Sequence, residues 1–280
     1  MSFTNANSLH NPILSPLVSW LMCAHVQNDH LRAAIHSCLD QTCQNFELII
    51  VLNGPIRDEI ERSINFWFPS HEKIRLYKTE IHHLIFSLNL GLNFARGQYI
   101  ARMDSDDISS LNRLAFQSNF LERNPNISVL GSAYNLIDED GTYITTVQNP
   151  EDNTSIRLAL LYTNPINHPS VMIRRDVLLN AGGYFGGLHA EDYDLWCRLA
   201  LDENILFSNL KEPLLNYRQF GVGAARRSRF AYATQAATQL NTFLLTGSIS
   251  WLISALISTF KGFFKSVRPK AVTWLRGGDE

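Results

Sequence analysis

The pattern of hydrophobic and polar residues along the chain predicts strands and helices in alternation. Residues 17–23 form an apolar run broken only by Ser19, which is typical of a strand buried on both faces of a parallel sheet. Apolar residues then recur at positions 31, 34, 35, 38 and 39, the spacing of one helix face. Residues 46–52 form a second apolar run, which ends at the turn Asn53-Gly54-Pro55. This part of the chain therefore predicts strand, helix and strand.

The same alternation continues beyond this point. Strands are expected at residues 74–77, 98–102, 127–137, 142–147 and 168–173. Helices are expected at residues 56–68, 87–95 and 112–122. Two further helices are expected, one that begins at Asp176 and one within residues 189–196. Strands that alternate with helices pair in parallel through right-handed crossovers. We therefore predict an α/β fold with a Rossmann-like, mostly parallel central sheet flanked by helices. Ligands of such sheets bind at the carboxyl ends of the strands, so residues that follow strands are candidates for a site.

Length and composition fit one large folded unit with additions at both ends. The chain has 280 residues, of which 45% are hydrophobic and 18% charged, as in ordinary globular proteins. We expect a flexible arm over residues 1–16, one α/β domain over 17–218 and a helical extension over 219–280. The net charge of -2 provides no broad basic surface, which argues against nucleic acid as a partner.

The first residues and the cysteines are typical of a cytosolic protein. The first sixteen residues are polar and lack the basic start and apolar run of a secretory signal peptide. Cys23, Cys38, Cys43 and Cys197 show neither a metal-binding C-x-x-C pattern nor the density of a disulfide scaffold. We therefore expect reduced, mostly buried thiols.

Three carboxylates, Asp104, Asp106 and Asp107, directly follow an expected strand. Carboxylates this close repel one another unless a cation lies among them, and oxygen ligands suit Mg²⁺ or Mn²⁺ rather than Zn²⁺. Mg²⁺ completes its coordination shell with water and substrate phosphates, which indicates a phosphate-bearing ligand. The alternative is a solvated acidic turn that caps a helix beginning near Ser109 or Ser110. The position at a strand end favours the ligand site.

A second acidic cluster, Glu191, Asp192 and Asp194, opens an expected helix. Acidic residues in a first helical turn are stabilised by free N–H groups and by the helix dipole, so capping alone would also explain them. Two such clusters after sheet elements are harder to explain by capping than one. The inward positions of this helix are expected to be Leu195, Trp196 and Leu199.

With both clusters identified, the chain resembles family 2 glycosyltransferases, the inverting nucleotide-sugar transferases of the GT-A fold. The resemblance covers residues 17–218 and rests on an ordered set of sequence blocks. These blocks are an apolar first strand, SCLDQTCQNFELIIV, GLNFARGQYIARMDSDD, HPSVMIRRDVLLNAGGY and AEDYDLWCRLA. Their order and spacing together, rather than any single block, carry the resemblance.

The resemblance implies a role for each acidic cluster. In the family, an Asp-x-Asp element holds the donor ribose and a divalent cation on the diphosphate, and here it maps onto Asp104, Ser105 and Asp106. We assign Asp106 as the direct ligand of Mg²⁺ or Mn²⁺ and Asp104 as a ribose or metal contact. The family's Glu-Asp pair maps onto Glu191 and Asp192, and Asp192 is assigned as the base that takes the acceptor hydroxyl proton.

The resemblance also implies the substrates. The donor is expected to be a nucleoside diphosphate sugar, with UDP-sugars favoured. The acceptor is expected to be a hydroxyl of a glycan or lipid-linked glycan in cell-envelope polysaccharide synthesis. We expect a hexosyl- or N-acetylhexosaminyl-transferase in the cytoplasm or on the inner face of the cytoplasmic membrane, with the oligomeric state left open.

The chain departs from the family pattern around the expected nucleobase pocket. His25 lies where the family often has Tyr, and it is a candidate nucleobase contact or a plain loop residue. An Asp-Asp-Gly-Ser sequence usually follows the second strand, but residues 52–55 read Leu-Asn-Gly-Pro, which leaves Asn53 as the candidate base contact. Arg96 and Arg102 are placed to approach a diphosphate or to pair with neighbouring carboxylates. These departures keep an alternative open: a noncatalytic nucleotide-sugar or glycan-binding relative with an impaired site.

The composition changes after Arg218. Helices are expected at 230–245 and 249–260, and residues 242–260 carry no charge, which meets the lower length limit for a bilayer span. Ser, Thr and Gly residues within this stretch weaken the prediction that it spans a bilayer. The mixture of aromatic and basic residues favours a helix lying on an anionic membrane surface. This mixture consists of Trp251, Phe260, Phe263 and Phe264 with Lys261, Lys265, Arg268 and Lys270. The other alternative is a helix pair packed on the domain or at a dimer contact.

Overall fold

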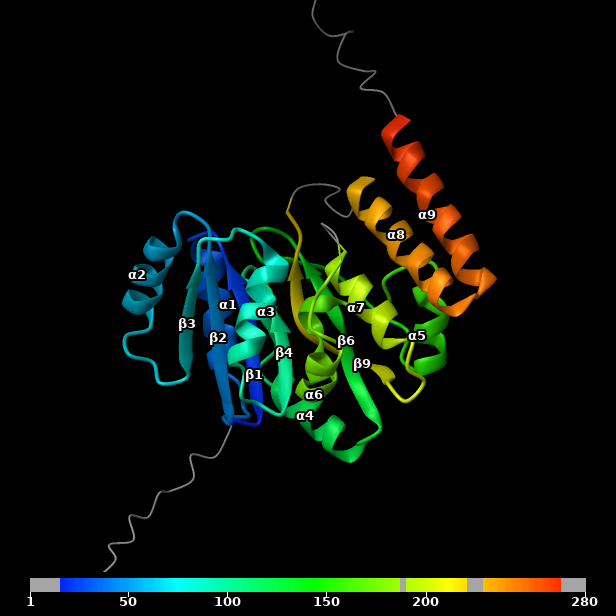
Figure 1. Cartoon of the computed structure of the whole chain (residues 1–280). Coiled ribbons are helices and arrows are strands. Elements are labelled where there is room, and N and C mark those ends of the chain that lie inside the picture. The colour runs from blue at the N-terminus through cyan, green and yellow to red at the C-terminus, as the bar shows by residue number, and fades with distance from the viewer. Residues whose placement is uncertain (1–15, 187–189, 221–228, 268–280) are drawn as a thin grey trace, which may run out of the picture.

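The computed structural model of the chain describes residues 16–186, 190–220 and 229–267. Within these residues the chain forms one sheet with helices around it, and two further helices follow at its C-terminal side (Figure 1). Of the arm expected over residues 1–16, only Pro16 belongs to the described part, so the arm lies outside it.

The strands form a single sheet in the order β3-β2-β1-β4-β8-β6-β9-β5, with β7 paired to β6. Their bounds are β1 Val18–Ala24, β2 Phe46–Asn53, β3 Ile74–Thr79, β4 Tyr99–Met103, β5 Ile108–Ser109, β6 Ile127–Ile137, β7 Tyr143–Val147, β8 Met172–Arg174 and β9 Leu206–Arg218. Strands β3, β2, β1 and β4 are parallel neighbours, and β6 is parallel to β9. Strand β8 runs antiparallel to both β4 and β6. The predicted α/β fold with a mostly parallel sheet is confirmed.

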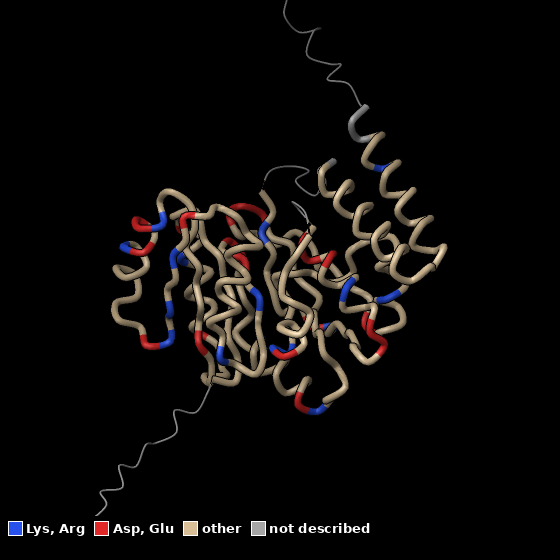
Figure 2. Tube along the Cα trace, viewed as in Figure 1, with Lys and Arg blue, Asp and Glu red and all other residues tan. Residues whose placement is uncertain are grey.

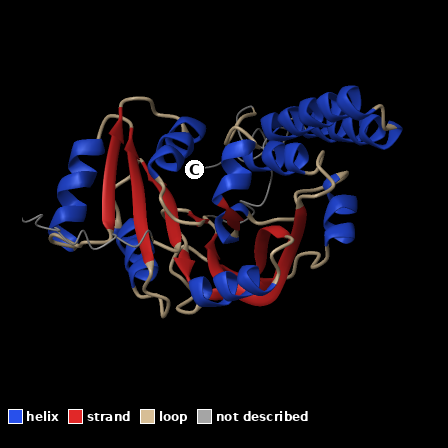
Figure 3. Cartoon of the chain, turned by 60° about the horizontal axis from the view of Figure 1, so that its bottom comes forward, coloured by secondary structure: helices blue, strands red, loops and turns tan. Residues whose placement is uncertain are grey.

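Helices cover both faces of the sheet (Figure 3). Their bounds are α1 Asp29–Leu39, α2 Arg57–Trp67, α3 Leu84–Phe94, α4 Arg113–Arg123, α5 Asn153–Leu160, η1 (a 3₁₀ helix) His168–Ser170, α6 Arg175–Asn180, α7 Glu191–Leu199, α8 Arg229–Thr246 and α9 Ile249–Val267. Along β1, Val18, Trp20 and Met22 pack with α1, α2 and α4 on one face. Leu21 packs with α3, α5, α6 and α7 on the other. Because side chains alternate between the faces of a strand, the continuous apolar run of β1 is buried on both sides.

Three parallel strands bring the site residues to one edge of the sheet. Strands β1, β2 and β4 end at Ala24, Asn53 and Met103. The register pairs Ala24 with Leu52 and Met22 with Met103, so the three ends are level with one another. The residues that follow them therefore share the carboxyl edge, where α/β sheets bind ligands.

Some segments differ from the expected pattern. Residues 168–170, expected to begin a strand, form the 3₁₀ helix η1, because Pro169 has no N–H to donate to a sheet ladder. The pattern does not predict β9 either, because the polar segment Lys211-Glu212-Pro213 interrupts it. The β6–β9 ladder shifts register at the same place. Helix α5 is a further unpredicted element.

The C-terminal extension forms a helical hairpin of α8 and α9 (Figure 1). Gly247, with a φ of +68°, separates the two helices, so the uncharged stretch 242–260 is not one continuous helix. No helix within residues 16–186, 190–220 and 229–267 is long and apolar enough to cross a membrane, so the spanning alternative is wrong. Helix α8 packs beside α7, where Gln239 Nε2 donates to Tyr193 Oη at 2.9 Å. Arg268, Lys270 and the side chain of Lys265 lie outside the described residues.

A buried arginine joins α4 to the elements next to the carboxyl edge. Arg113 is fully buried. Its guanidinium donates to the carbonyl oxygens of Arg102 at 2.9 Å, Pro169 at 2.8 Å and Val171 at 3.1 Å. Burial lowers the pKa of Arg113 to about 9, which still leaves the side chain charged at neutral pH. One side chain thus joins β4, η1 and the residue between η1 and β8.

We expect Arg113→Met to lower the free energy of unfolding by about 3 kcal/mol, because three buried carbonyl groups lose their donor. Urea denaturation measures this change. Arg123→Met, an exposed site on the same helix, is the matched control and should change stability by no more than about 0.5 kcal/mol. Equal effects of the two substitutions would show that the buried hydrogen bonds of Arg113 do not stabilise the fold.

Candidate active site

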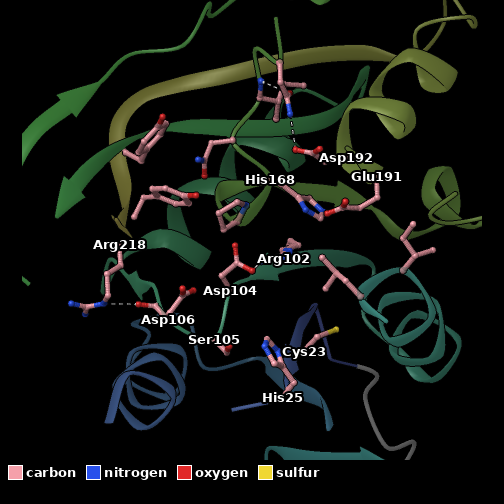
Figure 4. Close-up of a pocket in the computed structure, with 18 of the residues that line it drawn as sticks. Cys23, His25, Arg102, Asp104, Ser105, Asp106, His168, Glu191, Asp192 and Arg218 are labelled. Carbon is pink, nitrogen blue, oxygen red and sulfur yellow. Dashed lines mark hydrogen bonds and ion pairs between the residues drawn. The ribbon is translucent and has the colours of Figure 1, made fainter. Parts of the chain in front are cut away.

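A pocket of about 890 Å³ lies at the carboxyl edge of β1, β2 and β4 (Figure 4). Strand ends form one side of it, and residues 164–169 together with the start of α7 form the other. Each residue predicted from the sequence as a site residue lines this pocket. They are His25, Asn53, Arg102, Asp104, Asp106, Glu191 and Asp192. The fold therefore brings both acidic clusters and the expected nucleobase residues into one cavity.

The first acidic cluster is compact. Single carboxylate oxygens of Asp104, Asp106 and Asp107 lie within 4.8 Å of one another. The buried Arg102 forms an ion pair with Asp104. Arg218 lies on the other side of the cluster: its backbone N–H donates to Asp107 Oδ1 at 2.8 Å, and its Nε donates to the carbonyl oxygen of Asp106 at 2.8 Å. The two arginines hold the acidic turn in place from both sides.

The negative charge of this cluster is only partly compensated. Burial, with a further contribution from the charge of Asp104, raises the pKa of Asp106 to about 6. The same two causes raise the pKa of the buried Asp107 well above its ordinary value. A bound cation stabilises the ionised form of carboxylates whose pKa is raised in this way. Their oxygen atoms are suitable ligands for Mg²⁺ or Mn²⁺. The residues present therefore fit a divalent metal ion.

The second acidic cluster lies across the pocket from the first (Figure 4). Asp192 accepts hydrogen bonds from Asn164 Nδ2 at 2.6 Å and from the backbone N–H of Tyr193 at 2.8 Å. These two donors fix the orientation of the Asp192 carboxylate. Burial and then the charge of Asp192 raise the pKa of Glu191. The wall formed by the start of α7 thus holds an oriented carboxylate with a second acidic group beside it.

The predicted nucleobase residues lie beside the first cluster. Asn53 is buried, and its Nδ2 donates to Ser87 Oγ at 3.0 Å, while Ser87 Oγ donates to the carbonyl oxygen of His83 at 3.0 Å. This chain of donors fixes the amide of Asn53 and leaves its Oδ1 without a hydrogen-bond partner among the described residues. His25 and His82 face each other with ring centroids 5.1 Å apart. Burial and then His82 lower the pKa of His25, so its ring is neutral at neutral pH.

Several other residues discussed from the sequence have structural positions. Leu52 is fully buried in the core and does not belong to the pocket lining, so its difference from the family pattern leaves the pocket unaffected. Arg96 pairs with Glu47, at 2.8 Å from its Nη2, and does not line the pocket. Leu195, Trp196 and Leu199 are buried as predicted. All four cysteines are free thiols.

The structure adds pocket residues that the sequence pattern does not single out. Arg218 contacts Asp107 across a sequence separation of 111 residues, so no local motif links them. Asn164 lies in an irregular segment with no motif of its own. The His82-His83 pair is visible in the sequence, but only the fold places it beside His25. His168, also in the pocket, shares a hydrogen bond of 3.1 Å with Tyr184.

Comparison with known proteins identifies the family to which this chain belongs. The chain matches the family model described as Glycosyl transferase family 2 over residues 19–182. It is 36% identical over 251 residues to the O-antigen biosynthesis glycosyltransferase WbnJ of Escherichia coli, which covers 89% of this chain and 97% of that protein.

Solved structures share the fold at low sequence identity. S. aureus TarS 1–349 in complex with UDP-GlcNAc has a TM-score of 0.63 and 14% identity, covering 89% of this chain and 72% of that chain. The mannosyltransferase PcManGT of Pyrobaculum calidifontis, in complex with GDP-Man and Mn²⁺, has a TM-score of 0.57 and 14% identity, covering 91% and 76%. At these identities the likeness concerns the fold alone, and it confirms the expected GT-A architecture.

We expect Asp106→Asn to stabilise the metal-free protein at pH 7.5 while it removes stabilisation by Mn²⁺. The folded-state pKa of about 6 lies above the unfolded value of about 3.9, so ionised Asp106 lowers stability above pH 6. This cost disappears as the pH falls below the unfolded pKa. Because Asp106 is partly exposed, we expect a gain of only about 1 kcal/mol at pH 7.5, shrinking toward zero near pH 4.

Thermal and urea unfolding with a chelator and then with Mn²⁺ provide the measurement. Asp140→Asn, in an exposed turn, is the matched control and should behave as the wild-type protein does. Equal stabilisation of wild type and Asp106→Asn by Mn²⁺ would rule out Asp106 as a metal ligand.

Proposed function

Because the chain belongs to glycosyl transferase family 2, we propose that it transfers a sugar from a UDP-sugar to a hydroxyl of a glycan or lipid-linked glycan, with inversion at the anomeric carbon. The name of the relative WbnJ supports a role in cell-envelope polysaccharide synthesis. The UDP-GlcNAc bound to TarS supports a UDP-sugar donor of the hexosyl or N-acetylhexosaminyl class.

One observation carries this proposal: the two acidic clusters face each other across a single pocket. Asp104 and Asp106 lie at the strand ends, and Asp192 lies on the opposite wall (Figure 4). An inverting transfer needs such an arrangement, because the acceptor attacks the anomeric carbon from the face opposite the leaving diphosphate. The volume of about 890 Å³ is in the range of pockets that hold drug-sized ligands.

The reaction proposed is a single displacement. Asp192 removes the proton of the acceptor hydroxyl as the acceptor oxygen forms a bond to the anomeric carbon. The bond between that carbon and the diphosphate oxygen breaks at the same time, and the nucleoside diphosphate leaves with the bonding electron pair. Asn164 and the Tyr193 N–H hold the Asp192 carboxylate toward the pocket during this step. Glu191 completes the acidic wall.

Asp106 and Asp104 are the residues that would hold Mg²⁺ or Mn²⁺. When bound there, the cation supplies charge neutralisation for the departing diphosphate. Arg102, paired with Asp104, fixes this carboxylate and adds positive charge on the donor side of the pocket. We keep Asp107 as a residue that supports the turn, because its carboxylate accepts from the Arg218 backbone.

Asn53 is proposed to read the nucleobase. Its Nδ2 is occupied by Ser87, so only the acceptor Oδ1 remains for a ligand. A base that presents an N–H, such as the imide of uracil, satisfies this acceptor, whereas cytosine presents a lone pair at the same ring position. His25 and the adjacent His82 offer aromatic surface on the same side of the pocket.

The noncatalytic alternative loses much of its basis. It rested on the departures from the family pattern at residues 23–26 and 52–55, chiefly on Val26 and Leu52. Leu52 belongs to the core, and Asn53 retains a free acceptor in the place where a carboxylate is usual. The donor-side and acceptor-side carboxylates are both present in the pocket. These observations support an active enzyme.

We expect Asp192→Asn to lower kcat by about 10²- to 10⁴-fold, because an amide cannot accept the acceptor proton. Binding of UDP with Mn²⁺ should stay within a few-fold of wild type, since Asp192 lies on the opposite wall from the donor carboxylates. Steady-state transfer kinetics and a UDP thermal-shift titration give the two readouts. Turnover equal to that of wild type would remove Asp192 from its assigned role.

We expect the wild-type protein to bind UDP at least about tenfold more tightly than CDP, and Asn53→Leu to lose this preference. The reason is that a buried acceptor rejects a ligand lacking the matching N–H. Isothermal titration with both nucleotides and Mn²⁺ measures the difference, and Asn65→Leu on an exposed face of α2 is the control. If Asn53→Leu still prefers UDP, the base is read by other residues.

A further inference from the structure

The hairpin of α8 and α9 is more polar on its buried side than on its exposed side. The buried positions are small or polar: Ala231, Gln235, Ala236, Thr238, Gln239 and Thr242 on α8, and Ser254, Ala255 and Ser258 on α9. The exposed positions include Leu240, Leu244, Leu245, Ile249, Ile253, Leu256, Ile257, Phe260, Phe263 and Phe264. This distribution is the reverse of that in an ordinary surface helix.

The exposed apolar residues run along the hairpin, from Leu244 and Ile249 beside the turn to Phe260, Phe263 and Phe264 in the last turns of α9. Leu244, Ile249, Phe260, Phe263 and Phe264 each keep between 62% and 71% of their surface exposed. The rings of Phe260 and Phe264 stack with centroids 6.0 Å apart, and those of Phe263 and Phe264 are also 6.0 Å apart. Contiguous apolar surface of this kind marks a site where another molecule or a membrane binds.

The charge distribution indicates which partner fits this surface. Between Phe230 and Phe260 the sequence contains no charged residue, and the hairpin is almost uniformly tan in Figure 2. Between residues 213 and 278 there is no acidic residue at all. Apart from Arg218, which is buried in the pocket, the same segment of the sequence contains Arg226, Arg227, Arg229, Lys261, Lys265, Arg268, Lys270 and Arg276. An apolar helix pair flanked only by basic residues complements an anionic, partly apolar surface.

We propose that the outer face of the α8–α9 hairpin binds the surface of a bilayer that contains anionic lipid. The exposed Leu, Ile and Phe side chains enter the boundary between headgroups and acyl chains, and the exposed Lys261 side chain contacts the lipid phosphates. The helices lie on the surface, since within the described residues no helix is suited to cross it. This surface goes beyond the proposed transfer reaction and does not depend on it.

The hairpin is also connected to the acceptor side of the pocket. Gln239 of α8 is fully buried and donates to Tyr193 Oη and to the carbonyl oxygen of Leu161. Tyr193 directly follows Asp192, and Tyr193 Oη donates to the carbonyl oxygen of Leu160. The hairpin that is proposed to hold the membrane therefore packs directly on the helix that carries Asp192.

Cosedimentation of the full chain with vesicles tests this proposal. We expect binding to vesicles of phosphatidylcholine with phosphatidylglycerol, and weaker binding to phosphatidylcholine alone. The double variant Phe260→Ser/Phe263→Ser should lower the partition coefficient by about tenfold or more. Phe66→Ser/Phe116→Ser is the matched control, because both phenylalanines are exposed at 83% and 47% on other helices, and it should bind as wild type does.

Two results would overturn the proposal. One is a wild-type protein that stays in the supernatant with both kinds of vesicle. The other is a dimer, seen by light scattering, that Phe260→Ser/Phe263→Ser abolishes without any vesicle binding, since a second copy would then cover the surface. A thermal-shift titration with UDP and Mn²⁺ separates this test from the transfer function, because the hairpin variant should keep the wild-type response.

Discussion

The close approach of three carboxylates at the end of β4 is the constraint on which the site depends. Asp104, Asp106 and Asp107 lie in a partly buried turn, where burial and the charge of Asp104 raise the pKa of Asp106 and of Asp107. The fold tolerates this arrangement because Arg102 pairs with the cluster from within β4 and the Arg218 backbone and guanidinium bind it from the end of β9. The residual negative charge is what makes the pocket suited to a cation and, through it, to a diphosphate.

The change of strand direction after β4 gives the site its second wall. The parallel strands β3, β2, β1 and β4 provide the wall that is proposed to bind the donor, at the carboxyl edge where doubly wound sheets bind ligands. Strand β8 then runs antiparallel to β4, and the chain passes through residues 164–169 and α7 on the way to β9. This route carries Asp192 to the side of the pocket opposite Asp104, together with Asn164, which donates a hydrogen bond to it. The alternation of strands and helices alone would suggest a purely parallel sheet. Such a sheet does not explain how this second wall of the pocket is formed.

The sequence predicts the first half of the fold well and the second half less well, for physical reasons. Residues 17–23 and 46–52 are apolar because both faces of their strands are covered, so they are recognisable from local pattern. Strand β9 is only partly buried and contains Pro213, so its pattern is weak. The acidic residues of the pocket could be predicted because each cluster is contiguous in sequence. Arg218, Asn164 and His82 could not, because only long-range packing brings them there.

In the proposed reaction the acceptor attacks from the Asp192 wall while the diphosphate leaves toward Asp104 and Asp106. The most direct measurement is the anomeric configuration of the transferred sugar, read from proton coupling constants in the NMR spectrum of a product made from a UDP-sugar of known configuration. We expect inversion, because the two acidic clusters lie on opposite sides of the pocket. A product that retains the donor's anomeric configuration would contradict it.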